Sequence, residues 1–140
     1  GLVEPRLLSL ADEADTRLMA ATSSSSAAVM TQQCCDLVGP EVDVHHVLTP
    51  TALADLRAHH RDADSNENDI DETATYLIDE SPIDLMIFDD TLVVPGSDDE
   101  NGLVAAIAII ENPKALNWAR THIVWRRDNG ERLAESTTRR

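Results

Sequence analysis

The sequence predicts an α/β or α+β fold, in which helices pack on a mixed sheet of about five to six strands. In the first half of the chain, two short apolar strands are each followed by an amphipathic helix. Such units favour parallel strands with right-handed crossovers. The second half holds short apolar segments separated by turn residues, which is typical of a strand meander, and a last helix follows them.

The first strand-helix unit begins with residues 16–22, "TRLMAAT", a short buried strand. A run of four serines comes next and leads into a helix. Met30, Cys34 and Leu37 lie on one face of this helix, and residues 39–40, "GP", end it.

The second unit begins with residues 42–48, "VDVHHVL", a further strand. Thr49 supplies a helix N-cap and Pro50 suits the first turn. Leu53 and Leu56 then lie on one helix face. The two units in succession predict that the two strands pair in parallel.

Four apolar segments follow and predict strands, at residues 73–78, 83–88, 91–94 and 103–110. The gap between the second and the third is Asp89-Asp90, and the gap before the fourth is "PGSDDENG". Adjacent carboxylates after a strand suit a catalytic or metal site, but Asp also tolerates the positive φ of a tight hairpin. We therefore interpret Asp89-Asp90 as a turn.

The last helix is expected to begin at Asn112-Pro113, with Leu116, Ala119 and Ile123 on one face and Trp118, His122 and Trp125 on another. Residues 61–72 are polar and acidic and predict an insertion without a site. We divide the chain into a linker at 1–15, a sensor and oligomerisation domain at 16–133 and a disordered tail at 134–140. Because the chain begins at Gly1, we expect it to be cut from a longer protein.

The charge balance is the strongest signal in the composition. Asp and Glu number 26 against 11 Lys and Arg, so the formal net charge is -15, and Lys114 is the one lysine. This field repels phosphate, so nucleic-acid contact requires a separate domain. The acidity, the scarcity of lysine and an aromatic content of 3% resemble the proteins of halophilic archaea that accumulate salt.

The apolar segments are too short to span a bilayer, and no signal peptide opens the chain, so we expect a cytoplasmic protein without a membrane contact. Cys34 and Cys35 are adjacent and form no disulfide framework, which fits a reducing compartment. We expect Cys34 to be a small residue of the core.

Chemical motifs are scarce, and we expect neither catalytic residues nor a metal or cofactor. His45 and His46 point to opposite faces of a strand, and adjacent cysteines on a helix diverge, so neither pair chelates a metal. A composite site of Cys34 with a histidine stays open. No G-x-S-x-G, Walker or G-x-G-x-x-G motif occurs.

The hydroxyl-bearing residues after the first two strands are the candidate ligand site, namely Ser23, Ser24, Ser25, Ser26, Thr49 and Thr51. In open α/β sheets, ligands bind at the carboxyl ends of the strands, where hydroxyls and helix N-termini hold an anion or a polyol. The alternative is that these side chains only cap their helices.

Nearly the whole chain, roughly residues 16–133, also resembles a known family. "YLIDESPIDLMIFDDTLVVPG" and "IENPKALNWARTHIVWRRDNGERL" are similar to the C-terminal part of the sensor domain of archaeal winged-helix transcriptional regulators, both TrmB-like and methanogenesis-regulator-like. "VDVHHVLTPTALADL" resembles another segment of that domain. The segment "RTHIVWRRDNG" departs from the aromatic pattern of the family.

The resemblance implies a sheet related to half of the phospholipase-D fold, and a domain that senses a small-molecule effector and forms a homodimer. DNA binding would then reside in a winged helix N-terminal to Gly1. Phosphodiesterases of that fold need H-x-K, whereas His46-Val47-Leu48 carries leucine in place of the lysine, so we expect no enzyme. The alternative is a standalone small-molecule-binding enzyme domain of unknown reaction.

Overall fold

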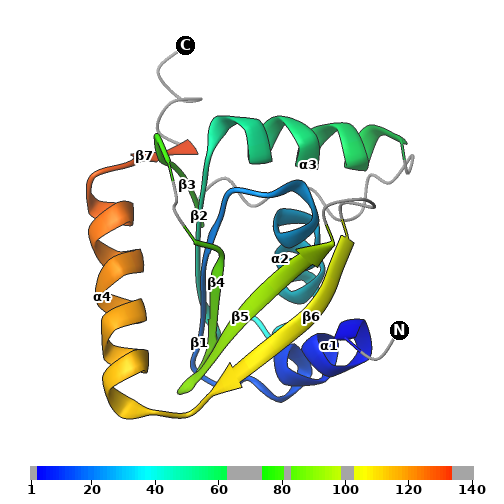
Figure 1. The fold of residues 1–140 in the computed structure, drawn as a ribbon. Helices are drawn as coiled ribbons and strands as arrows, with labels where there is room; N and C mark the ends of the chain where they lie inside the picture. The colour runs from blue at the N-terminus through cyan, green and yellow to red at the C-terminus, as the bar shows by residue number, and fades with distance from the viewer. Residues whose placement is uncertain (1–2, 63–73, 81–82, 99–102, 134–140) are drawn as a thin grey trace.

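The computed structural model describes residues 3–62, 74–80, 83–98 and 103–133. They form four helices and seven strands (Figure 1). In chain order these are α1 (Val3–Glu13), β1 (Arg17–Thr22), α2 (Ser25–Leu37), β2 (Asp43–Leu48), α3 (Pro50–Asp62), β3 (Thr75–Leu77), β4 (Leu85–Phe88), β5 (Thr91–Asp98), β6 (Leu103–Ile110), α4 (Pro113–Asp128) and β7 (Glu131–Arg132).

The strands form one mixed sheet in the order β6-β5-β4-β1-β2-β3-β7. β1, β2 and β3 are parallel to one another, with Ala20 opposite His46 and His46 opposite Thr75. β4 pairs with β1 in the antiparallel sense, and the meander of β5 and β6 continues from it. The amino end of β4 therefore lies beside the carboxyl end of β1.

Helices cover both faces of the sheet. Leu7 and Ala11 of α1 and Cys34 of α2 pack on Leu18 and Ala20 of β1. α3 joins the same layer as α2, and α4 lies alone on the opposite face (Figure 1). The alternation of side chains along β1 assigns one set to each layer.

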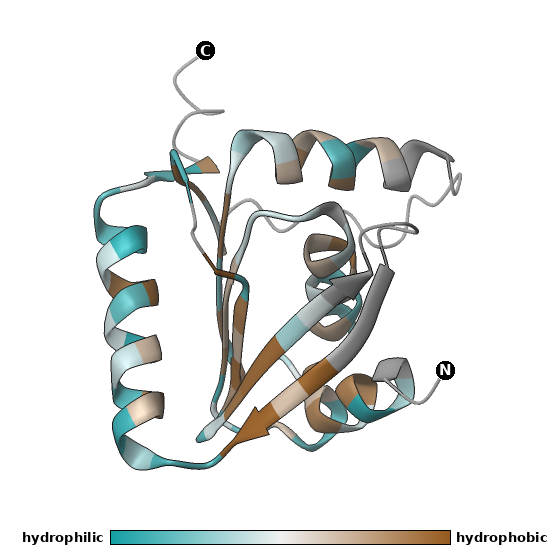
Figure 2. Cartoon of the chain, in the orientation of Figure 1, coloured by the Kyte–Doolittle hydropathy of each residue, from teal (hydrophilic) through white to brown (hydrophobic). Residues whose placement is uncertain are grey.

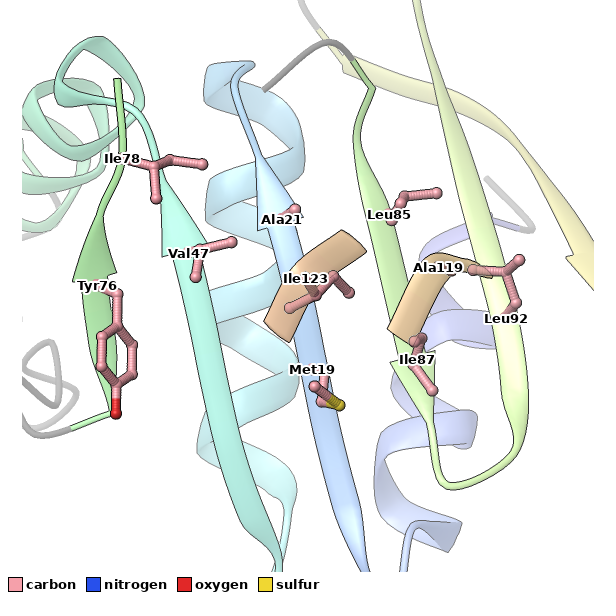
Figure 3. Packing of buried hydrophobic residues seen from close by; sticks show 10 residues of the cluster. All are labelled: Met19, Ala21, Val47, Tyr76, Ile78, Leu85, Ile87, Leu92, Ala119 and Ile123. Atoms are coloured by element: carbon pink, nitrogen blue, oxygen red, sulfur yellow. The ribbon is translucent and has the colours of Figure 1, made fainter. Parts of the chain in front are cut away.

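The core beneath α4 is a cluster of buried side chains from five strands and from α4 itself (Figure 3). Ala119 and Ile123, both fully buried, face Met19, Ala21 and Val47. α4 is otherwise largely hydrophilic in Figure 2, in contrast to the strands. Burial of the apolar side chains of Ala119 and Ile123 therefore stabilises the packing of α4 on the sheet.

The structure confirms the predicted fold class and both strand-helix units. Asn112 caps α4, since its side-chain oxygen accepts from the backbone N–H of Lys114 at 2.9 Å and of Ala115 at 3.2 Å. Cys34 is buried in the core, as predicted. No helix of the described residues is long and apolar enough to cross a membrane.

Three elements differ from the sequence expectations. Residues 3–13, assigned to a linker, form α1, because Leu7 and Ala11 recur at helical spacing and bury their side chains. β5 continues to Asp98, with a bulge between Gly96 and Ser97, where a turn from 95 was expected. β7 was not expected. Of the expected insertion at 61–72, residues 63–72 lie outside the described residues, as does the tail at 134–140.

Candidate functional site

The serine run lies at the carboxyl edge of the sheet, beside the segment that follows β2. β1 and β2 are in register up to Thr22 opposite Leu48, and the backbone N–H of Thr49 donates to the carbonyl of Thr22 at 3.2 Å. The fold therefore brings the two hydroxyl-bearing segments together at one edge of the sheet. We call this the serine-threonine edge, with Ser23, Ser24, Ser25, Ser26, Thr49 and Thr51.

A carboxylate already occupies this edge. Asp84 Oδ1 accepts from the backbone N–H of Ser23 at 2.7 Å and from its hydroxyl at 3.1 Å, and Oδ2 accepts from the Ser24 hydroxyl at 2.8 Å. These are hydrogen bonds to a charged group, the stronger kind. Asp84 thus fills the place that an external anion would take.

Two of the candidate hydroxyls also cap helices. Ser24 is the N-cap of α2 and accepts from the Ala27 N–H at 3.3 Å, while Thr49 accepts from the Ala52 N–H at 3.3 Å. Ser25 begins α2, and Ser26 is half-buried in its first turn. Thr51 is exposed on the first turn of α3 at the same edge.

Asp84 is the residue of this edge that sequence reasoning missed. Its position just before β4 gives no local signal, because only the antiparallel pairing of β4 with β1 carries it to Ser23. A pattern of one acid ahead of an apolar strand occurs also in ordinary turns.

His46 lies below the edge, on the sheet face that α2 and α3 cover. Its Nε2 is 2.8 Å from the Thr22 hydroxyl, and its side chain is 2% exposed. Burial lowers the pKa of His46 to about 4, so the ring is neutral at physiological pH. Its neighbour His45 points to the α4 side, as the alternation along a strand predicts.

Asp89 and Asp90 form the hairpin turn between β4 and β5. Asp89 has a φ of 55°, the positive region that a tight hairpin requires. Its carboxylate accepts from the backbone N–H groups of Asp15, Thr16 and Arg17. The turn interpretation is confirmed, and the Asp89 carboxylate ties the hairpin to the start of β1.

The cysteines and histidines do not gather into a metal site among the described residues. Burial first, and then the nearby charge of Asp36, raises the pKa of the Cys34 thiol to about 12, so it stays protonated. Cys34 donates to the carbonyl of Leu7 at 3.8 Å, a contact between α2 and α1. Its position therefore suits packing.

Two tryptophans stand on the outer side of α4. Trp118 and Trp125 are 55% and 57% exposed. The Trp118 ring stacks on His122 with 5.3 Å between centroids, and the Arg126 guanidinium lies 5.2 Å from the Trp125 ring centroid. Large exposed aromatic side chains are typical of interaction surfaces.

Comparison with known proteins assigns most of this chain to a family. The sequence model of the methanogenesis regulatory protein FilR1 middle domain matches residues 4–129. The chain belongs to the FilR1 middle-domain family. The regulator resemblance is thereby confirmed, and the match includes α1, so this helix is part of the FilR1 middle domain. Among curated protein sequences, no significant match was found.

Two solved structures share the FilR1 middle-domain fold of this chain. One is TrmBL2, an archaeal chromatin protein, with a TM-score of 0.58 and 13% identity over 92% of this chain. This chain spans 50% of that protein. The other is Nuc, a phospholipase D family member from Salmonella typhimurium, with a TM-score of 0.56 and 19% identity over 91% of this chain and 88% of Nuc. The predicted relation to the phospholipase-D fold is confirmed.

Proposed function

We propose that this chain is the effector-sensing and dimerisation domain of a haloarchaeal transcriptional regulator, and that a separate N-terminal winged helix binds the DNA. Membership of the FilR1 middle-domain family is the observation that carries the proposal. The net charge of -15 supports a salt-rich cytoplasm as its working environment.

The proposed effector site is the serine-threonine edge, with Ser23, Ser24, Ser25, Ser26, Thr49 and Thr51. The carboxylate of Asp84 beside Ser23 and Ser24 disfavours an anion there, since like charges repel at short range. A ligand rich in hydroxyls suits the edge better, because each hydroxyl both donates to a carboxylate and accepts from a hydroxyl or an N–H group. We therefore favour a sugar-like effector.

A thermal-shift titration with a panel of neutral mono- and disaccharides tests this site. Thr51→Ala is the sharpest variant, because Thr51 is exposed and its loss leaves both helix caps intact. We expect at least one sugar to raise the Tm of the wild type, and its affinity to fall by about 1 kcal/mol in Thr51→Ala. Thr121→Ala, an exposed threonine on α4, is the matched control. If Thr51→Ala and Thr121→Ala bind the sugar with equal affinity, Thr51 is not part of the site.

The proposed homodimer contact is the outer side of α4, where Trp118 and Trp125 are more than half exposed. A tryptophan at the centre of an interface contributes about 2 kcal/mol or more. The Trp118→Ala, Trp125→Ala double variant should therefore dissociate at concentrations where the wild type is dimeric. Light scattering in concentrated KCl measures this, with Leu37→Ala, an exposed leucine on α2, as control. A monomeric wild type would count against the contact.

We also propose that this chain alone does not bind duplex DNA, because its negative charge repels phosphate. A mobility shift with the 140-residue chain at moderate salt should show free DNA throughout the titration. A specific shifted band would overturn this part of the proposal.

A non-catalytic role is part of the proposal. Leu48 stands where an H-x-K motif carries lysine, and the one lysine, Lys114, lies at the start of α4. His46 is buried and hydrogen-bonded to Thr22, so a substrate phosphate would reach it only if the serine-threonine edge unfolded. Phosphodiesterase activity lost in His46→Gln would support the enzyme alternative instead.

A further inference from the structure

A groove with a volume of about 300 Å³ lies between α4 and the amino-terminal ends of β1 and β2. Three arginines line it: Arg17 from β1, and Arg120 and Arg127 from α4. Thr16, Met19, Asp43, His45 and Val124 complete the lining. The volume is at the small end of the range for ligand sites, so the groove suits a small molecule.

The concentration of arginine is unusual for this chain. The sequence has 11 Lys and Arg in 140 residues and a net charge of -15, yet three arginines line one groove. Asp43 is the one acidic residue of the lining, while Asp90 and Asp128 pair with Arg120 and Arg127 from outside it. A surface built only for solvation gives no reason for this gathering. A lining in which cationic side chains outnumber carboxylates attracts ligands of negative charge.

The hydrogen bonds that these arginines make among the described residues use only a minority of their N–H groups. Arg120 Nη2 lies 3.3 Å from Asp90, whose side chain is 86% exposed, and Arg127 pairs at 3.1 Å with its chain neighbour Asp128. Exposed pairs of this kind contribute little free energy. Within the described part of the chain, the Arg17 guanidinium has no ion pair.

Two buried polar atoms of the lining have no hydrogen-bond partner among the described residues, Arg120 Nε and His45 Nδ1. A buried polar atom left unpaired costs free energy, so each calls for a partner. Arg120 Nε is a donor. His45 Nε2 lies 2.9 Å from Asp43 Oδ2. In a neutral ring, a proton on Nε2 leaves Nδ1 as an acceptor.

We propose that this arginine groove binds a small organic anion whose carboxylate or phosphate group lies among the guanidinium groups of Arg17, Arg120 and Arg127. Guanidinium forks match both groups through paired hydrogen bonds. Met19 and Val124, which also line the groove, contact the carbon atoms of the ligand. The groove lies at the end of β1 and β2 opposite to the serine-threonine edge, so it does not depend on the effector site proposed there.

An NMR titration of the 140-residue chain tests the groove, with malate as a hydroxy-carboxylate probe and inorganic phosphate as the second probe. The side-chain Nε–H signals of Arg120 and Arg127 report binding at the groove directly. We expect millimolar or tighter binding of at least one probe at constant moderate ionic strength, and the tighter probe identifies the group that the guanidinium forks prefer. Arg120→Gln and Arg127→Gln should each weaken that binding by about tenfold or more.

Arg6→Gln is the matched control, because it makes the same change in charge at an exposed position on α1. Its affinity should stay within about twofold of the wild type, since screened charges at a distance contribute little. Arg120→Lys keeps the charge but not the fork, and it should bind more weakly than the wild type while unfolding at the same temperature. The proposal is overturned if neither probe shifts the Arg120 and Arg127 signals, or if Arg6→Gln weakens binding as much as the groove variants do.

Discussion

The Asp89 carboxylate is expected to be a main support of the sheet, because it joins the β4–β5 hairpin to the start of β1. It accepts from the Thr16 N–H and hydroxyl, both at 2.8 Å, and from the N–H groups of Asp15 at 3.0 Å and Arg17 at 3.1 Å. Partial burial by itself would raise its pKa, but these hydrogen bonds outweigh burial and lower the pKa from 3.8 to about 2. The folded state therefore favours the ionised form.

The magnitude follows from linkage. A shift of one pKa unit corresponds to about 1.4 kcal/mol, so the shift of Asp89 from 3.8 to about 2 corresponds to about 2.5 kcal/mol, which solvent screening reduces to about 1 to 2 kcal/mol. Because the folded-state pKa is lowered, this stability is present above pH 4 and is lost as the pH falls through about 2. Asp89→Asn should remove it while keeping a side chain that tolerates positive φ.

The assay is urea unfolding of the wild type, Asp89→Asn and Asp90→Asn at a series of pH values in constant salt. Asp90 is the matched control, since its side chain is 86% exposed with one 3.3 Å contact to Arg120, so its loss should cost less than about 0.5 kcal/mol. The gap between the wild type and Asp89→Asn should narrow between pH 4 and pH 2. Equal losses in the two variants, or a gap that stays constant over this range, would refute the reasoning.

Three further predictions concern the interior. Gly130→Ala should destabilise by about 1 to 3 kcal/mol in urea unfolding, because an added Cβ would lie 2.6 Å from the Leu77 carbonyl; no change would show that the backbone yields freely. Burial lowers the pKa of His46 from 6.5 to about 4, so between these pH values the unfolded chain binds more protons than the folded chain. The free energy of unfolding should therefore fall as the pH drops from 6.5 towards 4, by up to about 3 kcal/mol. This slope should disappear in His46→Gln, and an unchanged slope would assign it to other groups. In alkylation with a maleimide, Cys34→Ser should keep the fast phase of the half-buried Cys35, whereas Cys35→Ser should leave only slow labelling, because burial raises the Cys34 pKa to about 12.

Local chemistry was enough to predict much of the fold. The Asn112-Pro113 cap, the Asp89-Asp90 turn and the parallel strands depend on neighbours in the chain, so periodicity and turn residues identify them. β7 could not be predicted this way. It has two residues, Glu131 and Arg132, and exists because they pair with β3, an element more than fifty residues away.

The sequence predicted one of the two candidate sites but not the other, because one depends on local signals and the other on tertiary contacts. The hydroxyls of the serine-threonine edge follow strands directly, so a rule about strand ends finds them. Asp84 reaches that edge, and Arg120 and Arg127 reach Arg17, only through the strand order and the docking of α4. The sequence contains these side chains but not the tertiary contacts that bring them together.

The acidity of the chain excludes some partners and leaves others possible, because screening depends on distance. At about 1 M salt the Debye length is about 3 Å, so carboxylates elsewhere on the surface hardly influence a small anion held in contact with Arg17, Arg120 and Arg127. A DNA duplex is different, since its phosphates extend over many ångströms and would meet exposed carboxylates as well as any single basic groove. A small anion in the arginine groove is therefore compatible with our proposal that this chain, with its net charge of -15, does not itself bind duplex DNA. Raising the salt should weaken anion binding only modestly, because contact hydrogen bonds in the groove remain when long-range attraction is screened.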